Sequence, residues 1–191
     1  MTCIAALVHE GVVYVGADSC GSDGSSHSVR KDPKLAEVGE YVIGFTTSFR
    51  MGQLIIYSTL PTCTDTDLHR FMATSFVDHI RRTMKENGAL TTLNGVEFLG
   101  TFIVGVRGRL FVVESDFGVS EPACGYTAVG CGGACAIGCL YATQGQAPHQ
   151  RLIQALSAAT AHTTGVLPPY LIKSTRTPTP AASPTDTTPS K

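Results

Sequence analysis

A strand hairpin that begins at the second residue constrains this chain more than any other feature. The segments "TCIAALVH" (2–9) and "GVVYVGAD" (11–18) are rich in β-branched residues, and a short His-Glu-Gly turn separates them. β-Branched residues favour strands, and two such runs around a turn are typical of an antiparallel hairpin. "KLAEV" and "YVIGFTT", on either side of a Gly-Glu turn, predict a second hairpin. The N-terminal quarter of the chain therefore predicts about four antiparallel strands.

Amphipathic segments predict that helices follow these strands. Residues 66–88 carry apolar residues at every fourth position, which places them on one stripe of a long helix. These residues are Leu68, Met72, Phe76, Ile80 and Met84. A shorter helix is predicted around residues 48–60. A third hairpin, "GTFIVGVRG" with "RLFVVESD", and a short strand, "YTAVG", come next. "GGACAIGCLYATQG" and "PHQRLIQALSAATAHTT" then predict two further helices, and "PPYLIK" a last strand.

The order of these elements predicts an α+β fold. Strand hairpins are followed by two helices, another hairpin and two more helices, whereas a parallel sheet requires strands and helices in alternation. We therefore expect two antiparallel sheets face to face with helices outside, in one domain over residues 1–173. Residues 174–191 are rich in Pro, Thr and Ser and contain no large apolar residue. Because such a segment has nothing to bury, we expect it to be a disordered tail.

Composition and charge exclude several classes of function. The net charge is −1 at pH 7, so no global basic field attracts nucleic acid or membranes. Apolar runs such as "CIAALV" are too short to span a bilayer, and no basic segment precedes an apolar one as in a signal peptide. The cysteines number seven, and an odd count favours free thiols over a disulfide framework. These features predict a cytoplasmic protein.

Thr2 can acquire a catalytic role from its position behind the initiator methionine. A threonine hydroxyl needs a base to act as a nucleophile. Aminopeptidases remove Met1 when the next side chain is small, and Thr2 would then carry a free α-amine beside its hydroxyl. The ordinary pKa of an α-amine is about 7.7–8.0, which suits a general base near neutral pH. The alternative is that Thr2 is simply a β-branched strand residue.

Three further residues have the chemistry that a terminal nucleophile needs. Asp18 ends the second strand, and a tight hairpin brings that end beside the start of the first strand, next to Thr2. Lys34 begins the next strand segment, where its ammonium group can lower the pKa of the Thr2 amine and balance the negative charge that develops in a reaction. Gly44 lets the backbone approach a substrate closely, and its N–H can stabilise an oxyanion. Taken singly, Asp18 is also consistent with a turn residue and Lys34 with a solvated surface charge.

Together these residues resemble those of the N-terminal-nucleophile hydrolases. The resemblance rests on Thr behind Met, "GADS" closing the second strand, "DPKL" opening the third, "VIGF" soon after, and "AVGCGG" leading into a helix. More narrowly, the pattern resembles the proteasome β-subunits and the peptidase subunit of the bacterial two-component ATP-dependent protease, over residues 2–173. The resemblance implies the four-layer αββα sandwich of the Ntn hydrolase fold, in agreement with the order of elements.

The resemblance also implies a threonine-type endopeptidase and gives each residue a role. Thr2 would be the nucleophile, with its own amine as base, and would form an acyl-enzyme ester. Lys34 would tune the pKa of Thr2 and stabilise charge, and Asp18 would pair with Lys34 and orient it. The Gly44 N–H would form the oxyanion hole. No metal or organic cofactor would be needed. The implied partners are a peptide or unfolded protein substrate, further copies of the chain in a ring, and an ATPase unfoldase.

Two positions depart from the pattern of this family. Cys131 in "AVGCGG" stands where the family usually has a serine close to the amine of the nucleophile. A thiol is a weaker hydrogen-bonding group than a hydroxyl. Near the end of the last helix, "AHTTG" has Ala161 in place of an aspartate and Thr164 in place of a serine. Cys131 and Thr164 are therefore candidate site residues, and the missing carboxylate at position 161 leaves the support of the site incomplete.

Other functions are compatible with the same fold. One is an amidase acting on a small amide, and another is a ring or scaffold subunit whose site has decayed. Cys131, Cys135 and Cys139 would share one helix face, but three thiols on one helix do not easily close a tetrahedral zinc site. Packing of small residues against the sheet accounts better for them. Cys3, adjacent to Thr2, would be a rival nucleophile only if Thr2 were also removed.

Overall fold

Two antiparallel sheets form the centre of the computed structural model, which describes residues 1–175. The first sheet has the strand order β12-β1-β2-β13 and the second the order β11-β10-β9-β6-β5. The strands of the first sheet are β1 (Cys3–His9), β2 (Val12–Ala17), β12 (Tyr126–Gly130) and β13 (Leu171–Ser174). Those of the second are β5 (Leu35–Val38), β6 (Tyr41–Phe45), β9 (Phe102–Val106), β10 (Arg109–Val113) and β11 (Val119–Ser120). All neighbouring strands in both sheets run antiparallel.

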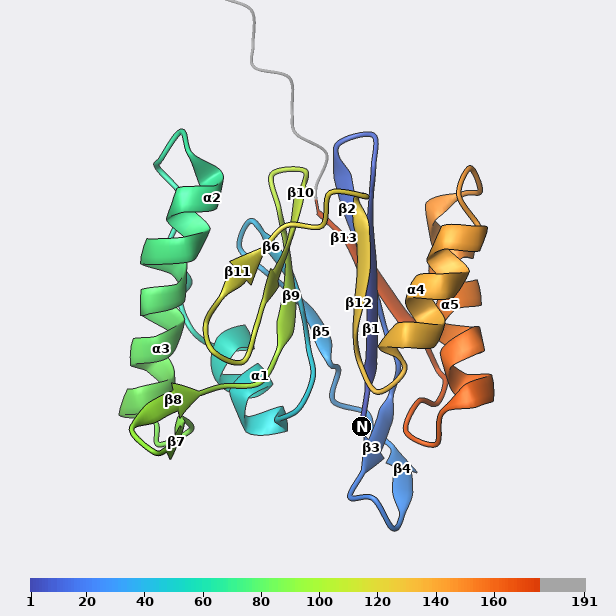
Figure 1. The fold of residues 1–191 in the computed structure, drawn as a ribbon, viewed down its shortest axis with the longest axis horizontal. Helices are drawn as coiled ribbons and strands as arrows, with labels where there is room; N and C mark the ends of the chain where they lie inside the picture. Colours follow the sequence, from blue (N-terminus) through green and yellow to red (C-terminus); the bar gives the residue numbers. More distant parts are fainter. Residues whose placement is uncertain (176–191) are drawn as a thin grey trace, which may run out of the picture.

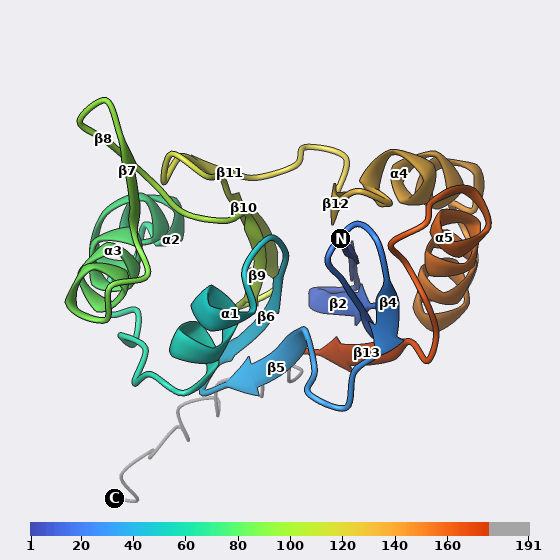
Figure 2. The ribbon, with the colours of Figure 1, turned by 90° about the horizontal axis from the view of Figure 1, so that it is seen from below.

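Helices cover the outer face of each sheet, which gives four layers (Figures 1 and 2). The first sheet is covered by α4 (Gly133–Ala142) and α5 (Pro148–His162). The second is covered by α1 (Phe49–Ile56), α2 (Leu68–Phe71), the π-helical turn η1 (Met72–Phe76) and α3 (Val77–Glu86). The predicted α+β fold, a four-layer αββα sandwich, is therefore confirmed.

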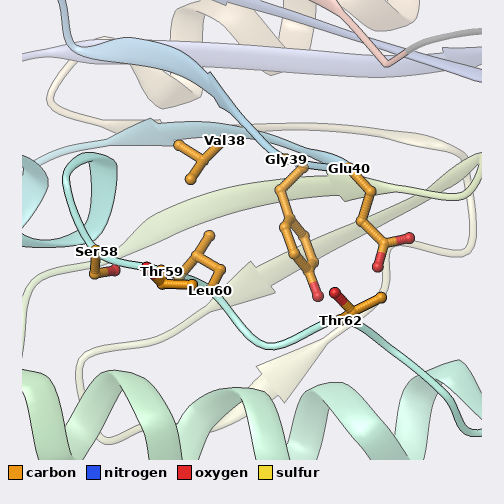
Figure 3. A pocket seen from close by; sticks show the side chains of 8 residues that line it. Val38, Gly39, Glu40, Ser58, Thr59, Leu60 and Thr62 are labelled. Atoms are coloured by element: carbon orange, nitrogen blue, oxygen red, sulfur yellow. The ribbon is translucent and has the colours of Figure 1, made fainter.

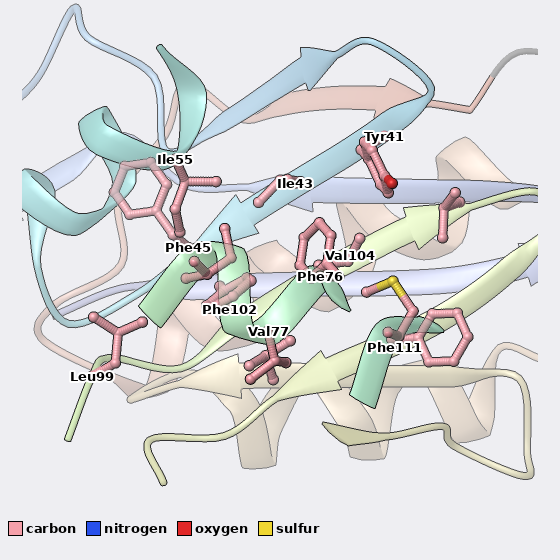
Figure 4. Packing of buried hydrophobic residues seen from close by; sticks show 14 of the residues in the cluster. Tyr41, Ile43, Phe45, Ile55, Phe76, Val77, Leu99, Phe102, Val104 and Phe111 are labelled. Atoms are coloured by element: carbon pink, nitrogen blue, oxygen red, sulfur yellow. The ribbon is translucent and has the colours of Figure 1, made fainter. Parts of the chain in front are cut away.

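The strand β1 shows how the layers are held together. Cys3, Ala5 and Leu7 pack in the cluster between the first sheet and α4 and α5, whereas Ile4 and Ala6 pack between the two sheets. This alternation follows from the two-residue period of a strand, with both faces buried. A third cluster, between the second sheet and α1 to α3, contains most of the phenylalanine side chains (Figure 4). By the same alternation, the residue before Cys3 belongs to the inter-sheet side.

The long helix predicted over residues 66–88 is divided in the structure into α2, η1 and α3. The five apolar residues at four-residue spacing are nevertheless all buried. In an α-helix with about 3.6 residues per turn, each four-residue step rotates the side chain by about 40°. The wider π-helical turn offsets this rotation and keeps the stripe facing the second sheet.

Two short hairpins lie outside the sandwich and are absent from the sequence prediction. β3 (Cys20–Ser22) pairs with β4 (His27–Val29) in the segment between Asp18 and Lys34, for which the sequence predicts no strand. β7 (Thr91–Leu93) pairs with β8 (Val96–Phe98) and projects from the helical layer that covers the second sheet (Figure 2). Both hairpins are short, and most of their residues are exposed.

The last described residues pair with β2. The predicted tail begins at Ser174, but Ser174 belongs to β13 and Thr175 is buried. The Thr175 N–H donates to the Val13 carbonyl (2.9 Å), and the Thr175 hydroxyl oxygen accepts from the Val13 N–H (3.0 Å). The remainder of the predicted tail, 176–191, lies outside the described residues. Within residues 1–175, no helix combines the length and apolar character that crossing a bilayer demands.

Candidate active site

The hairpin β1–β2 brings Asp18 next to the start of β1. Ile4 pairs with Ala17, so the next step of the ladder sets Cys3 opposite Asp18. The Cys3 N–H donates to Asp18 Oδ1 (2.9 Å), and the Asp18 N–H donates to the Cys3 carbonyl (3.3 Å). Thr2, directly before Cys3, is 5% exposed. The structure therefore places Asp18 beside the Thr2–Cys3 peptide, as the hairpin predicts.

Lys34 and Asp18 form a buried ion pair. Lys34 Nζ lies 2.9 Å from Asp18 Oδ1, and the two side chains are 1% and 0% exposed. The other carboxylate oxygen, Oδ2, accepts the N–H groups of Cys20 (2.8 Å) and Leu167 (3.4 Å). Two buried charges are tolerated when they are paired and their remaining hydrogen-bonding capacity is used. The backbone of three segments therefore holds this carboxylate in one orientation.

The Thr2 hydroxyl and the Lys34 ammonium meet at the Met1 carbonyl oxygen. Thr2 Oγ1 donates to this oxygen (2.6 Å), and so does Lys34 Nζ (3.3 Å). While Met1 is present, the Thr2 nitrogen is an amide and cannot act as a base. Removal of Met1 would take away the carbonyl and leave an α-amine and a hydroxyl next to the ammonium group. A free hydroxyl and a basic amine could therefore coexist on Thr2 only in a chain without Met1.

Cys131 contacts both backbone polar groups of Thr2. The Thr2 N–H donates to Cys131 Sγ (3.3 Å), and the thiol donates to the Thr2 carbonyl (3.4 Å). Gly130 is opposite Cys3 in the ladder and has a φ of +94°, and a Cβ there would overlap the Thr2 carbonyl oxygen. Glycine is therefore required at position 130 for this close approach. The Cys131 thiol lies where it would meet the α-amine of Thr2.

Gly44 is placed differently from the sequence prediction. It lies inside β6 with its α-carbon toward the first sheet, where a Cβ would be 2.6 Å from Ile4 Cγ2. The Thr46 N–H donates to the Thr101 carbonyl (3.0 Å), and the two-residue alternation of the ladder then gives the Gly44 N–H to Ile103. Because the sheet uses this N–H, it is not available to an oxyanion. The prediction that Gly44 forms the oxyanion hole is corrected accordingly.

Thr47 offers a backbone N–H at the site instead. Thr47 lines the same small cavity as Thr2 and Lys34, and its φ is +68°. The Ser48 N–H donates to the Thr46 carbonyl (2.7 Å), whereas the Thr47 N–H has no acceptor within residues 1–175. An unpaired donor in a small cavity suits a developing oxyanion. No pattern in the sequence indicates this donor, because threonine rarely adopts a left-handed backbone conformation.

Thr164 and Ala161 lie at the periphery of the site. Both residues are exposed. The Thr164 hydroxyl reaches the sulfur of Met1 (4.0 Å), and within the described chain neither side chain hydrogen-bonds to Thr2 or to the Lys34–Asp18 pair. The structure therefore places Thr164 next to Met1 rather than in the hydrogen-bond network around Thr2.

Comparisons with known proteins find this fold in solved structures, while no family model and no curated protein sequence matches the chain. BPH from Thiobacillus denitrificans in complex with epoxomicin gives a TM-score of 0.77 at 16% identity, covering 91% of this chain and 97% of BPH. Eukaryotic HslV from Trypanosoma brucei gives a TM-score of 0.64 at 18% identity, and the match covers 91% of this chain and 98% of HslV. An Anbu (Gly-1) mutant from Hyphomicrobium sp. strain MC1 gives a TM-score of 0.67 at 16% identity, and the match covers 90% of this chain and 80% of the Anbu chain. The chain has the fold of these proteins.

The match to BPH and HslV confirms, at the level of the fold, the resemblance inferred from the sequence. It extends over 91% of the chain in both cases. At identities of 16% and 18%, the roles of individual side chains rest on the geometry of this chain itself.

The cavity at Thr2 is small, about 80 Å³, and a larger pocket lies elsewhere. Figure 3 shows this larger pocket, of about 410 Å³, between the β5–β6 turn and residues 58–62. Its carboxylate, Glu40, is paired with Arg107 (Nε–Oε2 2.8 Å), and the hydroxyl of Tyr41 donates to the Pro61 carbonyl. Burial also raises the pKa of the Tyr41 phenol. The carboxylate and the phenol of the larger pocket are therefore engaged in contacts within the chain, and the volume of a pocket is a poor guide to its chemistry here.

The other cysteines near the site are structural. Burial, reinforced by the Asp18 carboxylate, raises the pKa of the Cys3 thiol to about 12. A thiol with a raised pKa is a poor nucleophile near neutral pH, and the Cys3 side chain packs toward α4 and α5, on the face of β1 opposite to Thr2. Cys135 and Cys139 pack from α4 against the first sheet, whereas Cys131 precedes the helix. In the part of the chain that the structure describes, no three His, Cys, Asp or Glu side chains are arranged to hold a metal ion.

Proposed function

We propose that the chain is a threonine-type peptidase that hydrolyses peptide bonds with Thr2 after Met1 has been removed. The observation that carries this proposal is the buried Lys34–Asp18 ion pair, held against the carbonyl that precedes Thr2. Buried charges are costly, and a strongly desolvated pair beside a hydroxyl is typical of functional sites. The fold shared with BPH, a protein solved with epoxomicin bound, also supports the proposal.

In the proposed reaction, Thr2 Oγ1 attacks the carbonyl carbon of the substrate while the α-amine of Thr2 accepts the hydroxyl proton. The Lys34 ammonium stabilises the negative charge that develops near Thr2, and Asp18 fixes its position. The Thr47 N–H donates to the oxyanion. The protonated amine then passes its proton to the leaving nitrogen, and water hydrolyses the ester on Thr2. Cys131 takes the place of a hydroxyl in holding the amine.

Intact-mass spectrometry with a covalent probe tests this proposal. We expect the purified chain to have lost Met1 and to gain the mass of one epoxomicin, a peptide epoxyketone. A chain that keeps Met1 contradicts the terminal-amine mechanism. A processed chain that no epoxyketone or β-lactone labels would instead fit the catalytically decayed scaffold.

The form of the substrate follows from the small site. Thr2 and Lys34 are almost completely buried while Met1 is present, and the small cavity beside them is lined in part by Met1, so the site is recessed. A folded protein cannot present a peptide bond there, whereas an extended chain can. The proposal therefore includes unfolded protein or peptide as substrate, and an ATPase unfoldase as the partner that would supply it.

The helical layer of α4 and α5 supports the further proposal that copies of the chain assemble. From Pro122 to Ile172 the only residue among Asp, Glu, Lys and Arg is Arg151, which is buried. The opposite outer layer carries exposed charges of both signs, at Asp67, Arg70, Asp78, Arg81, Arg82, Lys85 and Glu86. Ile137, Tyr141 and Ile153 are 40%, 68% and 49% exposed on α4 and α5. An uncharged face with exposed apolar side chains can meet a second copy of itself without repulsion.

Lysine substitutions on this face are expected to reduce the assembly. The double variant Ile137→Lys/Tyr141→Lys would place unpaired charges in the contact, which costs several kcal/mol. The mass measured by light scattering should then fall from a multiple of 20.1 kDa toward 20.1 kDa itself. Ser75→Lys, on the exposed side of the charged layer, should leave the mass of the wild type unchanged. A wild-type chain at 20.1 kDa, or a double variant of unchanged mass, contradicts this proposal.

Alkylation of Cys131 is expected to inhibit the proposed activity. The residue is exposed and its sulfur touches the Thr2 backbone, so an added group would occupy the space around the amine. Iodoacetamide should lower peptide hydrolysis by about tenfold or more, since a blocked base removes a general-base contribution. Cys131→Ser should keep activity and resist the reagent. Cys124→Ser, which removes another exposed thiol, should remain sensitive, and equal inhibition of both variants would contradict the assignment.

A further inference from the structure

A second cavity lies directly beside the Thr2 cavity. It has a volume of about 280 Å³, and most of its lining is apolar, including Met51, Leu93 and Phe98. Thr47 and Ser48 line both cavities. A chain bound at Thr2 that follows these two residues therefore enters the second cavity.

The hairpin β7–β8 supplies one wall of this cavity with one of its faces. Leu93 pairs with Val96, and Phe98 lies two residues further on the same face. Glu97 lies on the opposite face, where it contacts Arg81 of α3. The ion pair thus turns the charged face toward α3 and the apolar face away from α3, toward the second cavity.

The position of this wall is well defined. Asn94 and Gly95 have φ values of 51° and 79°, the two positive values of a type I′ turn, which suits a two-residue hairpin. The base of the hairpin is fixed by a hydrogen bond from the Leu99 N–H to the Ser115 carbonyl (2.8 Å). Leu93 and Val96 are nevertheless 63% and 51% exposed. Packing within the described chain does not account for two apolar side chains held outward on a projecting hairpin (Figure 2).

A polar group marks the boundary between the cavities. The Thr47 N–H has no acceptor in residues 1–175, and Thr47 belongs to both linings. A ligand that fills both cavities would accept the Thr47 N–H with a carbonyl oxygen and would place an apolar side chain in the space beside Leu93. A peptide has both groups on one backbone, at the spacing of adjacent residues.

We propose that the second cavity is a substrate subsite in which the apolar face of β7–β8 binds an apolar side chain of the peptide, a few residues from the bond cleaved at Thr2. A volume of about 280 Å³ accommodates a leucine or phenylalanine side chain. The inference rests on the proposed peptidase function and adds a specificity determinant, Leu93, to it.

Labelling rates with reagents of different length test this subsite. A series of peptide epoxyketones is lengthened by one leucine at a time, and a small alkyl β-lactone serves as a reagent too short to reach the hairpin. The rate of Thr2 labelling is measured by intact mass in wild type, Leu93→Ser and Thr92→Ala, the last on the opposite face of the same hairpin.

We expect one added leucine to accelerate labelling of wild type and of Thr92→Ala by roughly tenfold, the usual effect of one apolar contact. The same added leucine should not accelerate labelling of Leu93→Ser. The β-lactone should label all three chains equally. Equal acceleration in Leu93→Ser, or an equal loss for every reagent, would overturn the subsite. If no reagent labels wild type, the proposed function itself fails, which is a distinct result.

Discussion

Replacing Thr2 with alanine is expected to lower peptide hydrolysis by a factor on the order of 10⁴ or more, the scale seen when a covalent nucleophile is removed. Thr2 Oγ1 is the hydroxyl that faces the Lys34 ammonium across the Met1 carbonyl. Without it, no ester can form and an epoxyketone has no oxygen to attack its ring. The measurement combines a fluorogenic peptide assay with intact-mass detection of the epoxomicin adduct.

Alanine at position 2 is also a fair comparison with the wild type. Its side chain is small, so the initiator methionine is removed from both chains and the α-amine is present in both. Thr2→Ser provides the matched positive control, because it keeps the hydroxyl and loses only a methyl group. We expect this variant to retain the adduct. Equal labelling of wild type and Thr2→Ala would assign the nucleophile to another residue.

The sequence predicts the part of the site that depends on local pairing. The β1–β2 hairpin joins its two strands through a short turn, so its register, with Ile4 opposite Ala17, places Asp18 at the start of β1. The layers are predictable for the same reason, since hairpins and helices follow one another in blocks. Lys34 directly precedes β5 of the other sheet, and its contact with Asp18 could be expected only from the resemblance.

Gly44 shows where local reasoning fails. Its sequence context allows close approach of a backbone, and the structure does use the missing Cβ, but for packing against Ile4. Whether a strand is central or at an edge is a long-range property, and β6 has neighbours on both sides. The N–H of a central strand is used by the ladder. The backbone N–H that is unpaired within residues 1–175 belongs instead to Thr47, which lies beyond the end of β6.

The sequence does not predict the β7–β8 hairpin, for a different reason. Asn94-Gly95 is a strong signal for a two-residue turn, but the flanking "TTL" and "VEF" are short and partly polar. The spacing of apolar residues in 66–88 likewise contains the signal for a π-helical turn, since four successive steps of four residues exceed the period of an α-helix. In both cases the element could be recognised only once its neighbours were placed.

Replacing Lys34 with methionine is expected to remove both activity and part of the stability. Taken singly in the sequence, Lys34 is also consistent with a solvated surface charge, whose loss would spare the fold. In the structure its side chain is 1% exposed and paired with a carboxylate that is 0% exposed. Breaking a buried pair leaves an uncompensated charge and costs roughly 3–5 kcal/mol. Asp18 keeps the N–H groups of Cys3, Cys20 and Leu167, so we expect the lower end of that range.

For a chain of this size, a loss of about 3 kcal/mol lowers the melting temperature by roughly 6–12 °C. Differential scanning calorimetry measures this shift, and epoxomicin labelling well below the transition measures the activity of the folded variant. Lys31→Met, the same substitution at an exposed neighbouring lysine, should change neither. The two readouts separate two roles of one side chain. A lower melting temperature with normal labelling would make the ion pair purely structural, whereas lost labelling at an unchanged melting temperature would show that the backbone N–H groups alone suffice to hold the Asp18 charge.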